Sequence, residues 1–352
     1  MTLFNTMGDT TQSVPKAAII VLNWNRWRDT VLCLESICAM TYPNCKVFVV
    51  DNGSTDDSVR HIKTWMSERG IPFREKLETD LETTAKRIEI AAQTGDQTRH
   101  FTLIKNGWNL GYTAGNNVGI RHALQDGADY ILLLNDDTKV SPDLLGRMLA
   151  TAEKDPAVGI VGCKIYSLEE PAKVQFQGGH ISLWFGLYGF FDRSQGNKRG
   201  EIDSNFAPGC ALLIKREVLE SIGLLEEKYF MYAEDVEFPH RALKAGWKVR
   251  INLDASIWHR SVPERGSRST GYYYYGTRNF LYFISDYLRG LQKASCLLFF
   301  VGGRLLLVAG WILKGRYQHV KATWEGLRDF RRGVTGLVNS EVARTDERVK
   351  VR

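Results

Sequence analysis

Short apolar runs alternate with longer amphipathic stretches through the first half of the chain. Each apolar run has the length and unbroken apolar character of a strand buried on both faces of a parallel sheet. Each amphipathic stretch has the spacing of a helix that covers such a sheet. The predicted strands lie at residues 17–22, 46–50, 101–105, 130–134 and 158–163, and the predicted helices at 28–40, 57–69 and 142–154. The alternation predicts βαβ units and therefore an α/β fold with a mainly parallel central sheet.

The pattern is less regular further along the chain. Residues 71–100 are polar, charged and weakly helical, and they predict an insertion at the periphery of a domain that spans residues 16–285. Residues 175–205 are rich in glycine and aromatic residues and support no assignment. Pro239 is compatible with a helix only because it lies near the first turn. The remaining predicted elements are strands at 210–214, 247–251 and 255–258, a helix at 216–222, and a helix that begins at Glu234.

Residues 286–352 differ in kind and predict a basic, amphipathic helical extension. Residues 295–313 are apolar except for Arg304 and three glycines. As a membrane-spanning helix this run is of borderline length and carries a charge near its middle. Cationic residues follow it, which favours a helix pair that lies on an anionic membrane surface. Packing on the domain or on a partner subunit and a true membrane span are the alternatives.

Composition and charge narrow the function. Hydrophobic residues make up 44% and charged residues 24% of the 352 residues, which is typical of a globular protein and excludes wholesale disorder. From Arg289 to the end, 13 Lys or Arg stand against 5 Asp or Glu, a net charge of +8, whereas the first 288 residues have 33 against 35, or −2. This distribution argues against nucleic acid as a partner. It predicts an anionic membrane surface as a partner of residues 289–332.

The six cysteines show neither a CxxC pair nor the spacing of a zinc site. Residues 1–15 are polar, carry no secretory signal and predict a disordered lead-in. We therefore expect reduced cysteines in packing positions. The expected location is the cytoplasm, peripheral on the inner face of the cytoplasmic membrane.

Two adjacent carboxylates, Asp136 and Asp137, follow the apolar run at 130–134. Such a pair at the end of a buried strand is costly unless a cation meets it. Mg²⁺ and Mn²⁺ prefer oxygen ligands, and Mg²⁺ commonly combines one or two carboxylates with substrate phosphates. The sequence therefore predicts a divalent-metal site with Asp137 as ligand, with solvated strand-end acids as the alternative. Asp136 is expected to touch a ribose or order the loop, and His259, after a later strand, is a candidate third ligand as neutral imidazole.

Polar residues follow the other strands of the same sheet edge, where ligands of open α/β sheets gather. Asn23 and Asn25 come after the first strand, and Asp51 and Asn52 after the second. The Asp51 carboxylate can accept the imide N–H of uracil or thymine, and the alternative is that it caps the next turn. Glycines that permit close backbone approach to a ligand occur at Gly111, Gly115 and Gly119. Their spacing matches neither GxGxxG nor a Walker A loop.

A second acidic cluster begins a predicted helix with Glu234, Asp235 and Glu237. The helix dipole favours acids at that position, so capping is the simple interpretation. Three acids in four residues exceed what a cap requires, and crowded carboxylates raise one another's pKa. One of them then becomes a usable general base near neutral pH. Arg241 shares a helical face with Glu234 and Glu237 and is expected to hold the cluster in place.

Together and in this order, these segments resemble the glycosyltransferase family 2 enzymes of GT-A fold, most closely the rhamnosyltransferase-like, non-processive branch. The resemblance covers residues 16–285. Its segments are 49–56 (nucleotide binding), 109–119 (an NxGxxxGxNxG loop), 134–137 (a DxD-type metal motif), 209–218 (a strand–helix element at the sugar site), 234–237 with Arg241 and Gly246 (an ED motif), 258–259 (a late metal histidine) and 272–279 (an aromatic-Arg-Asn segment).

The resemblance implies an inverting, metal-dependent transfer from a nucleoside-diphosphate sugar to a hydroxyl of a saccharide or lipid-linked acceptor, in cell-surface polysaccharide synthesis. A UDP- or dTDP-sugar is the implied donor, with dTDP-rhamnose the first candidate. Asp235 would be the base, supported by Glu234, Glu237 and Arg241. Asp137 and His259 would hold Mg²⁺ or Mn²⁺. The implied donor-binding residues are Asn23, Asn25, Asp51, Asn52, Asn109, Gly111, Gly115, Asn116, Asp136, Gly209 and Cys210.

Some features depart from the family pattern, and others count against alternative functions. Pro239 stands where the family's helix usually continues, so this helix is expected to start late or bend, and the insertion at 71–100 is unusually long. No QxxRW motif is present, which argues against a processive synthase. A sugar-nucleotide pyrophosphorylase would need a glycine-rich, cationic loop after the first strand, and residues 23–26 are not one. A carbohydrate-binding or scaffolding module is the other alternative, and the intact acidic clusters count against it.

Overall fold

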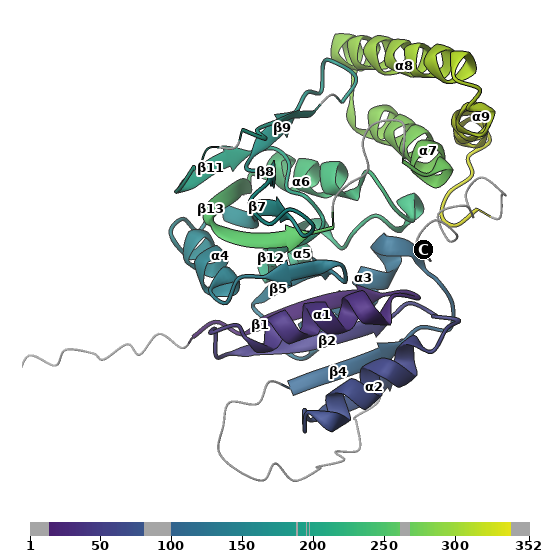
Figure 1. Ribbon diagram of the computed structural model, residues 1–352. Helices are drawn as coiled ribbons and strands as arrows, with labels where there is room; N and C mark the ends of the chain where they lie inside the picture. The colour runs from purple at the N-terminus through teal and green to yellow at the C-terminus, as the bar shows by residue number, and fades with distance from the viewer. Residues whose placement is uncertain are drawn as a thin grey trace, which may run out of the picture.

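A central sheet carries helices on both faces and a layer of three helices at one end (Figure 1). The computed structural model describes residues 14–80, 100–187, 189–194, 196, 198–260 and 268–338. One half of the sheet is parallel throughout, in the order β5-β1-β2-β4-β3. These strands are β1 (Ala17–Asn23), β2 (Cys45–Asp51), β3 (Phe73–Leu77), β4 (His100–Lys105) and β5 (Tyr130–Asn135).

The other half of the sheet mixes directions. β12 is antiparallel to both β5 and β7, whereas β13 runs parallel to β7. β11 and the short strands β6 and β8 pair antiparallel with this half, and β9 and β10 form a separate hairpin. The expected mainly parallel sheet is thus confirmed. The bounds are β6 (Thr138–Val140), β7 (Val158–Ser167), β8 (Val174–Phe176), β9 (Gly179–Ile181), β10 (Gly189–Phe191), β11 (Glu201–Ser204), β12 (Ala211–Lys215) and β13 (Lys248–His259).

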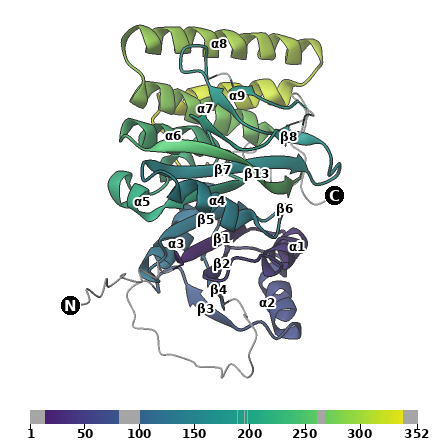
Figure 2. The same ribbon diagram turned by 90° about the vertical axis from the view of Figure 1, so that its left-hand side faces the viewer.

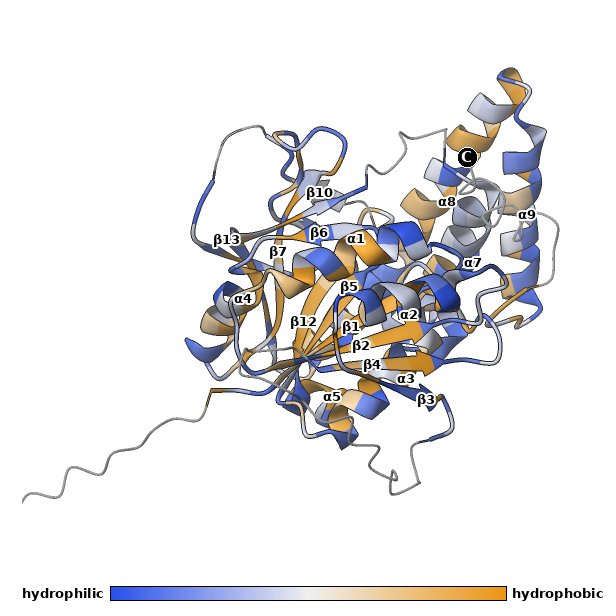
Figure 3. Cartoon of the chain, turned by 60° about the horizontal axis from the view of Figure 1, so that its bottom comes forward, coloured by the Kyte–Doolittle hydropathy of each residue, from blue (hydrophilic) through white to orange (hydrophobic). Residues whose placement is uncertain are grey.

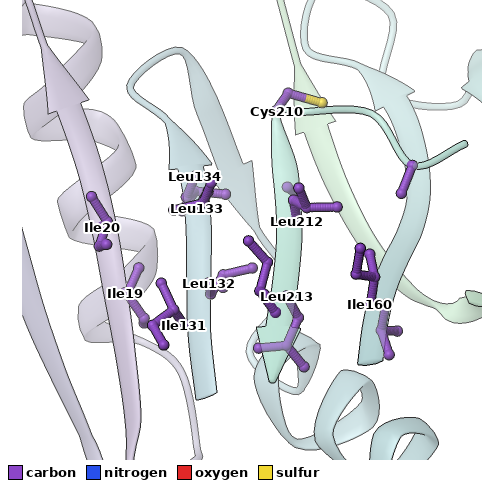
Figure 4. Packing of buried hydrophobic residues seen from close by; sticks show 14 of the residues in the cluster. Ile19, Ile20, Ile131, Leu132, Leu133, Leu134, Ile160, Cys210, Leu212 and Leu213 are labelled. Atoms are coloured by element: carbon purple, nitrogen blue, oxygen red, sulfur yellow. The ribbon is translucent and has the colours of Figure 1, made fainter. Parts of the chain in front are cut away.

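The core forms where the apolar runs of neighbouring strands lie in register. Ile20 on β1 is opposite Leu133 on β5, which is opposite Leu212 on β12, and all three side chains are buried (Figure 4). The central strands β1, β2, β4 and β12 are coloured hydrophobic in Figure 3, whereas the edge strand β3 is hydrophilic. α1 (Trp27–Cys38) and α2 (Ser58–Glu68) cover one face, and α3 (Gly111–Gln125) and α5 (Arg216–Ile222) the other (Figure 2). Among the six cysteines, all within the described residues, Cys33, Cys163, Cys210 and Cys296 are buried, whereas Cys38 is exposed and is not in the packing position expected.

Several elements differ from the prediction. β3 lies within the segment expected to be weakly helical, and its polar residues suit an edge strand that faces solvent. Residues 81–99 of that segment, and residues 1–13 of the lead-in, lie outside the described residues. α3 begins at Gly111, so most of the expected 109–119 loop is helical. The two strands expected at 247–251 and 255–258 are one strand, β13, whose pairing with β7 shifts between Asn252 and Ser256.

Two further helices pack on β7 and β13. α4 (Leu144–Glu153) contacts β7 and β13, and α6 (Glu234–Lys244) follows a short 3₁₀ turn at Glu227–Tyr229. α6 starts at Glu234 and continues through Pro239, which corrects the expectation of a late start. Pro239 has no N–H to donate to the Asp235 carbonyl, so the helix loses one internal hydrogen bond there.

The three helices at the end of the molecule pack against one another through aromatic side chains. They are α7 (Thr270–Tyr287), α8 (Gly290–Leu313) and α9 (Tyr317–Arg331). The Tyr273 ring on α7 lies 4.5 Å from that of Trp311 on α8, and the Tyr274 hydroxyl donates to Asp329 on α9 at 2.8 Å. Among the described helices, α8 is the one long and apolar enough to cross a membrane, by length and composition only.

Gly111 tests how closely α3 must approach the rest of the fold. Its φ is +80°, and a Cβ added there would lie 2.3 Å from the Phe230 ring and 2.5 Å from the Phe230 carbonyl oxygen. Gly127 has the same φ with open space around it, so it is a matched control. Both Gly→Ala substitutions incur the left-handed backbone penalty of about 1–2 kcal/mol. We expect Gly111→Ala to lower the free energy of unfolding by about 1–3 kcal/mol more than Gly127→Ala, measured by urea denaturation. Equal losses would contradict the close approach.

Candidate active site

The Asp137 carboxylate and the His259 imidazole lie together at one edge of the sheet. Asp137 directly precedes β6, and β6 pairs with the end of β13 so that Thr138 is opposite His259. This pairing places Oδ1 of Asp137 3.2 Å from Nε2 of His259. Both side chains are nearly buried, with 11% and 14% of their surface exposed. The structure therefore brings together the two residues expected to ligate a metal.

Arg26 is the cation that meets the two adjacent carboxylates within the chain. Its Nη1 lies 3.0 Å from Oδ2 of Asp137 and 3.5 Å from Oδ1 of Asp136, and its Nη2 lies 2.7 Å from Asp29. Burial by itself lowers the pKa of Arg26, but the three carboxylates outweigh burial and hold this pKa above its usual value. Our sequence analysis missed Arg26. The signal was its position, directly after the polar residues that end the first strand.

The residues present fit a divalent ion that completes its shell with substrate. Among the described residues, no group of three or more His, Cys, Asp and Glu side chains is arranged to hold a metal. Asp137 and His259 supply one carboxylate oxygen and one imidazole nitrogen side by side. Mg²⁺ typically binds one or two protein carboxylates and takes its other ligands from substrate phosphates and water. Two protein ligands and a phosphate-bearing donor are consistent with that pattern.

Asp51 lies at the end of β2 and is 3% exposed. Its Oδ1 accepts from Asn23 Nδ2 at 2.7 Å and from the Ser54 hydroxyl at 2.6 Å, and its Oδ2 accepts from the Ser54 N–H at 3.1 Å. Asn25 has φ +53°, and its Oδ1 accepts from the N–H of Thr55 at 2.8 Å. The polar ends of β1 and β2 thus shape one turn, and Asp51 caps it.

Asn52 joins the end of β2 to the start of α3. Its Nδ2 donates to Asn109 Oδ1 and to the Gly111 carbonyl, each at 3.0 Å, and its Oδ1 accepts from the Leu110 N–H at 3.1 Å. Asn116 donates to the Tyr112 carbonyl at 2.8 Å inside α3. A Cβ at Gly115 would lie 2.8 Å from Leu22 Cδ1, so this glycine lets α3 pack closely on the sheet. The close approaches here are between parts of the chain itself.

A strained turn precedes the acidic cluster on α6. Three non-glycine residues, Phe230, Tyr232 and Ala233, have positive φ angles of 65°, 65° and 82°. Each such conformation costs of the order of 1–2 kcal/mol and persists only where the surroundings hold it. Nδ2 of the buried Asn279 donates to the carbonyl oxygens of Tyr229, Met231 and Tyr232 at 2.8, 2.7 and 3.0 Å.

Arg278 fixes the orientation of that amide. Its Nε donates to Asn279 Oδ1 at 3.0 Å, which leaves the Asn279 NH₂ group facing the turn. Arg278 is fully buried, and its Nη2 also donates to the Tyr229 carbonyl at 3.2 Å. From the sequence, Arg278 and Asn279 belong to a segment that resembles the family, and neither residue was assigned a role. We infer that they are positioning residues for the start of α6.

Glu234 and Asp235 have raised pKa values. Burial raises the pKa of Asp235 to about 6. Burial, reinforced by the charge of Asp235, raises the pKa of Glu234 to about 8. Among the described residues, nothing hydrogen-bonds to Oε2 of Glu234. The two carboxyls titrate as a pair, and one of them is available as a base near neutral pH.

Tyr112, Gly209 and Cys210 lie beside this acidic pair. The Tyr112 hydroxyl donates to the Gly209 carbonyl at 2.6 Å, and a Cβ at Gly209 would lie 3.0 Å from that hydroxyl. Burial raises the pKa of the Cys210 thiol, and the charges of Asp137 and Asp235 add to the rise. The Tyr112–Gly209 hydrogen bond thus joins the start of α3 to the segment before β12.

Glu237 belongs to the packing of α6. It is fully buried, and the Arg241 guanidinium pairs with it while also donating to the Leu224 carbonyl at 2.7 Å. The Tyr287 hydroxyl donates to the same carboxylate. Arg241 thus neutralises Glu237 and ties α6 to the segment before it, in line with the expected i, i+4 contact.

A model of the family described as glycosyl transferase family 2 matches residues 18–77 and 82–223, more than half of the chain. The chain belongs to glycosyl transferase family 2. The glycosyltransferase class expected from the sequence is confirmed. The match ends before α6 and the end of β13, so the roles of Asp235 and His259 in this glycosyltransferase stay proposals.

Several curated relatives of this glycosyltransferase are named as transferases of sugars. The chain is similar to the low-salt glycan biosynthesis hexosyltransferase Agl10 of Haloferax volcanii, with 26% identity over 60% of this chain and 67% of that one. It is also similar to the N-acetylglucosaminyl-diphospho-decaprenol L-rhamnosyltransferase of Mycobacterium tuberculosis, with 25% identity over 47% and 60%. The galactofuranosyltransferase GlfT1 of the same organism is 27% identical over 43% and 49%. The chain thus spans about half to two thirds of these relatives.

Solved structures share the fold. The mannosyltransferase PcManGT from Pyrobaculum calidifontis, in complex with GDP-Man and Mn²⁺, has a TM-score of 0.54 and 16% identity over 90% of this chain and 85% of that one. TarS 1–349 from S. aureus, in complex with UDP-GlcNAc, has a TM-score of 0.56 and 16% identity over 91% and 81%. At these identities the likeness concerns the fold alone. It confirms the expected GT-A architecture.

The clamp on the strained turn predicts a selective loss of turnover. Asn279→Ala removes four hydrogen bonds, three to carbonyl oxygens and one from Arg278, at about 1 kcal/mol each, so we expect a loss of about 4 kcal/mol in the free energy of unfolding. The freed turn should also misplace Asp235, so kcat for transfer should fall at least about tenfold while the Kd of the donor nucleotide changes little. Asn252→Ala is the control, because this buried amide makes comparable bonds to Arg147 and Thr151 on the α4 side. A similar fall in kcat for both variants would refute the positioning role.

Proposed function

We propose that this chain transfers a sugar from a nucleoside diphosphate to an acceptor hydroxyl with inversion at the anomeric carbon. The observation that carries the proposal is the pairing of Asp137 with His259, whose Oδ1 and Nε2 lie 3.2 Å apart at one edge of the sheet. An inverting transfer needs a base on one side of the sugar and stabilisation of the leaving group on the other. Asp235 is proposed as the base, and Asp137 with His259 as the residues that stabilise the leaving group.

The reaction follows from these positions. Asp235 removes the proton of the acceptor hydroxyl as its oxygen attacks the anomeric carbon. The bond from that carbon to the donor diphosphate breaks, and the electron pair leaves with the diphosphate. Asp137 and His259 would hold a Mg²⁺ or Mn²⁺ ion, which as a Lewis acid stabilises charge on the leaving group. Arg26 adds a fixed cation beside the same carboxylates. The solved complexes with GDP-Man and Mn²⁺ and with UDP, GalNAc and Mn²⁺ support the choice of ion.

The donor proposed is a UDP- or dTDP-sugar, with dTDP-rhamnose the first candidate. Asp51 lies at the end of β2. Its carboxylate, oriented by Asn23 and Ser54, can still accept the imide N–H of a pyrimidine. The rhamnosyltransferase relative and the UDP-GlcNAc complex of TarS support this class. Asn25, Asn52, Asn109, Gly111, Gly115, Asn116, Asp136, Gly209 and Cys210 are proposed to shape the donor site.

The acceptor proposed is a saccharide, free or lipid-linked, in cell-surface polysaccharide synthesis. The relative whose name includes N-acetylglucosaminyl-diphospho-decaprenol acts in rhamnosyl transfer and supports a lipid-linked acceptor. The proposed domain runs from residue 16 to 285, and the basic extension from 286 meets an anionic membrane surface. Such a chain works at the cytoplasmic face of the membrane.

A donor panel tests the function directly. UDP-, dTDP- and GDP-sugars are incubated with Mg²⁺ or Mn²⁺, and donor hydrolysis and thermal stabilisation are measured with and without EDTA. Metal-dependent stabilisation by one nucleotide class is expected. No response to any nucleotide from folded protein would favour a binding module, and release of pyrophosphate from a nucleoside triphosphate would indicate a pyrophosphorylase.

Asp235→Asn should abolish transfer and leave donor binding largely intact, because the amide cannot take up the proton. We expect a fall in kcat of at least about 10²-fold with little change in donor Kd. In the unaltered protein kcat/KM should rise with pH through about 6, since the base works only when deprotonated and burial raises the pKa of Asp235 to about 6. Equal losses of binding and turnover would rule out the base assignment.

Asp137→Ala should weaken nucleotide binding only when the metal is present. We expect the stabilisation that Mn²⁺ adds to the nucleotide complex to disappear, because one of two protein ligands is lost. Asp203→Ala, at an exposed carboxylate on β11, is the control and should bind nucleotide normally. An unchanged metal dependence in Asp137→Ala would remove this residue from the site.

A further inference from the structure

The outer face of α8 is the largest exposed apolar feature of the described residues. Its most exposed side chains are Leu291, Leu298, Phe299, Leu305, Leu306, Ile312 and Leu313, each at least 49% exposed. Exposed apolar surface on this scale marks an interaction site in a soluble domain. α8 lies along one end of the molecule, away from β3 and β4 (Figure 2).

A loop of the catalytic part adds to this face. Residues 182–187 lie between β9 and β10, and Trp184 and Phe185 in this loop are 49% and 52% exposed. The Phe185 ring meets Phe299 edge-on with centroids 5.2 Å apart, and the Ser295 hydroxyl donates to the Trp184 carbonyl at 3.1 Å. A Cβ at Gly186 would lie 2.6 Å from the Phe300 nitrogen, so the loop backbone rests directly on α8.

Charge selects the partner of this face. The exposed charged residues of 289–332 are all cationic, namely Arg289, Lys314, Arg316, Lys321, Arg331 and Arg332. The two acids in this range are less accessible, since Asp329 is buried against Arg328 and Glu325 is half-buried. A second copy of the chain would bring like charges together. An anionic lipid surface complements both the apolar and the cationic residues.

The inner face of α8 excludes a spanning orientation. Cys296, Phe300 and Trp311 are buried along its length, with Phe300 and Trp311 packed on Phe280 and Tyr273 of α7. Arg304 lies in the same stripe near the middle of the helix, 3.6 Å from the place of a Cβ on Gly276 of α7. α7 also carries the buried Arg278–Asn279 pair. A spanning α8 would have to leave α7 or take its polar groups into the bilayer.

We propose that α8 lies flat in the headgroup region of an anionic membrane together with the 182–187 loop of the catalytic part. Through this loop the sugar-transfer domain itself contacts the membrane surface. This contact sets the distance and tilt of the domain relative to the membrane. This inference rests on the membrane contact of the proposed function and adds to it the 182–187 loop and the orientation of α8, neither of which requires a donor or an acceptor. The site would then face along the membrane at a set height.

Vesicle flotation tests the proposal with the full chain and with vesicles of phosphatidylcholine, with or without phosphatidylglycerol. We expect binding that needs phosphatidylglycerol and is released by high salt. The double variant Trp184→Ser with Phe185→Ser should reduce partitioning about tenfold. Lys314→Ala, Arg316→Ala and Lys321→Ala should each reduce it about fivefold. Leu32→Ser, at a 58% exposed leucine on α1, is the control and should bind as the unaltered chain does.

Unfolding midpoints and donor hydrolysis in solution are measured for every variant. They should stay unchanged, which separates a failure of this proposal from a failure of the proposed function. Loop variants that float as well as the control would overturn the role of residues 182–187. Binding that resists salt and alkaline carbonate would overturn the flat orientation. A dimer in solution with no vesicle binding would assign the face to a second copy.

Discussion

The start of α6 depends on one amide. Phe230, Tyr232 and Ala233, in the turn before α6, have positive φ angles. Hydrogen bonds from Asn279 hold this turn, and Arg278 sets the orientation of the Asn279 amide. Without that clamp the backbone would relax toward right-handed conformations, and the acidic pair would move with it. Because Asn279 belongs to α7, the same contact connects α6, which carries the proposed base, to the layer that carries α8. Chemistry and proposed membrane contact therefore share one rigid element.

Charge compensation organises the part of the site around Asp136 and Asp137. Asp136 and Asp137 lie at the end of a buried strand, and Arg26 and His259 approach them from two distant parts of the sequence. An internal cation lowers the cost of burying two carboxylates before any ligand arrives. A divalent ion that enters this site has to share or displace the Arg26 contact. Metal affinity is thus coupled to the position of one side chain on the loop after β1.

The proposed donor residues divide into two groups by their contacts. The amides of Asn52 and Asn109 form hydrogen bonds that join β2 to the start of α3, and the Asn116 amide forms one inside α3. Their effect on a ligand is therefore through the backbone that they position. Asp51 caps a turn, and one of its oxygens accepts a single N–H bond. Their place at the end of a strand identified Asp51 and Asn52, and the family resemblance implied Asn109 and Asn116. The sequence did not distinguish side chains that build the pocket from side chains that face a ligand, because both classes are polar residues at strand ends.

The sequence by itself determined the parallel core, since continuous apolar runs such as 130–134 can be buried only between two helical layers. It also placed Asp136, Asp137 and the acidic start of α6, because their cost or crowding is visible along the chain. Tertiary structure alone decided the contacts between residues far apart in sequence: His259 reaches Asp137 through β6–β13 pairing, and Asn279 reaches the 229–232 turn from α7. Tertiary structure also decided that α3 begins at Gly111 and that residues 73–77 form an edge strand, because the local sequence has only a weak propensity for either. Local pattern encodes what must be buried, whereas the partner of each buried group depends on packing that no short window contains.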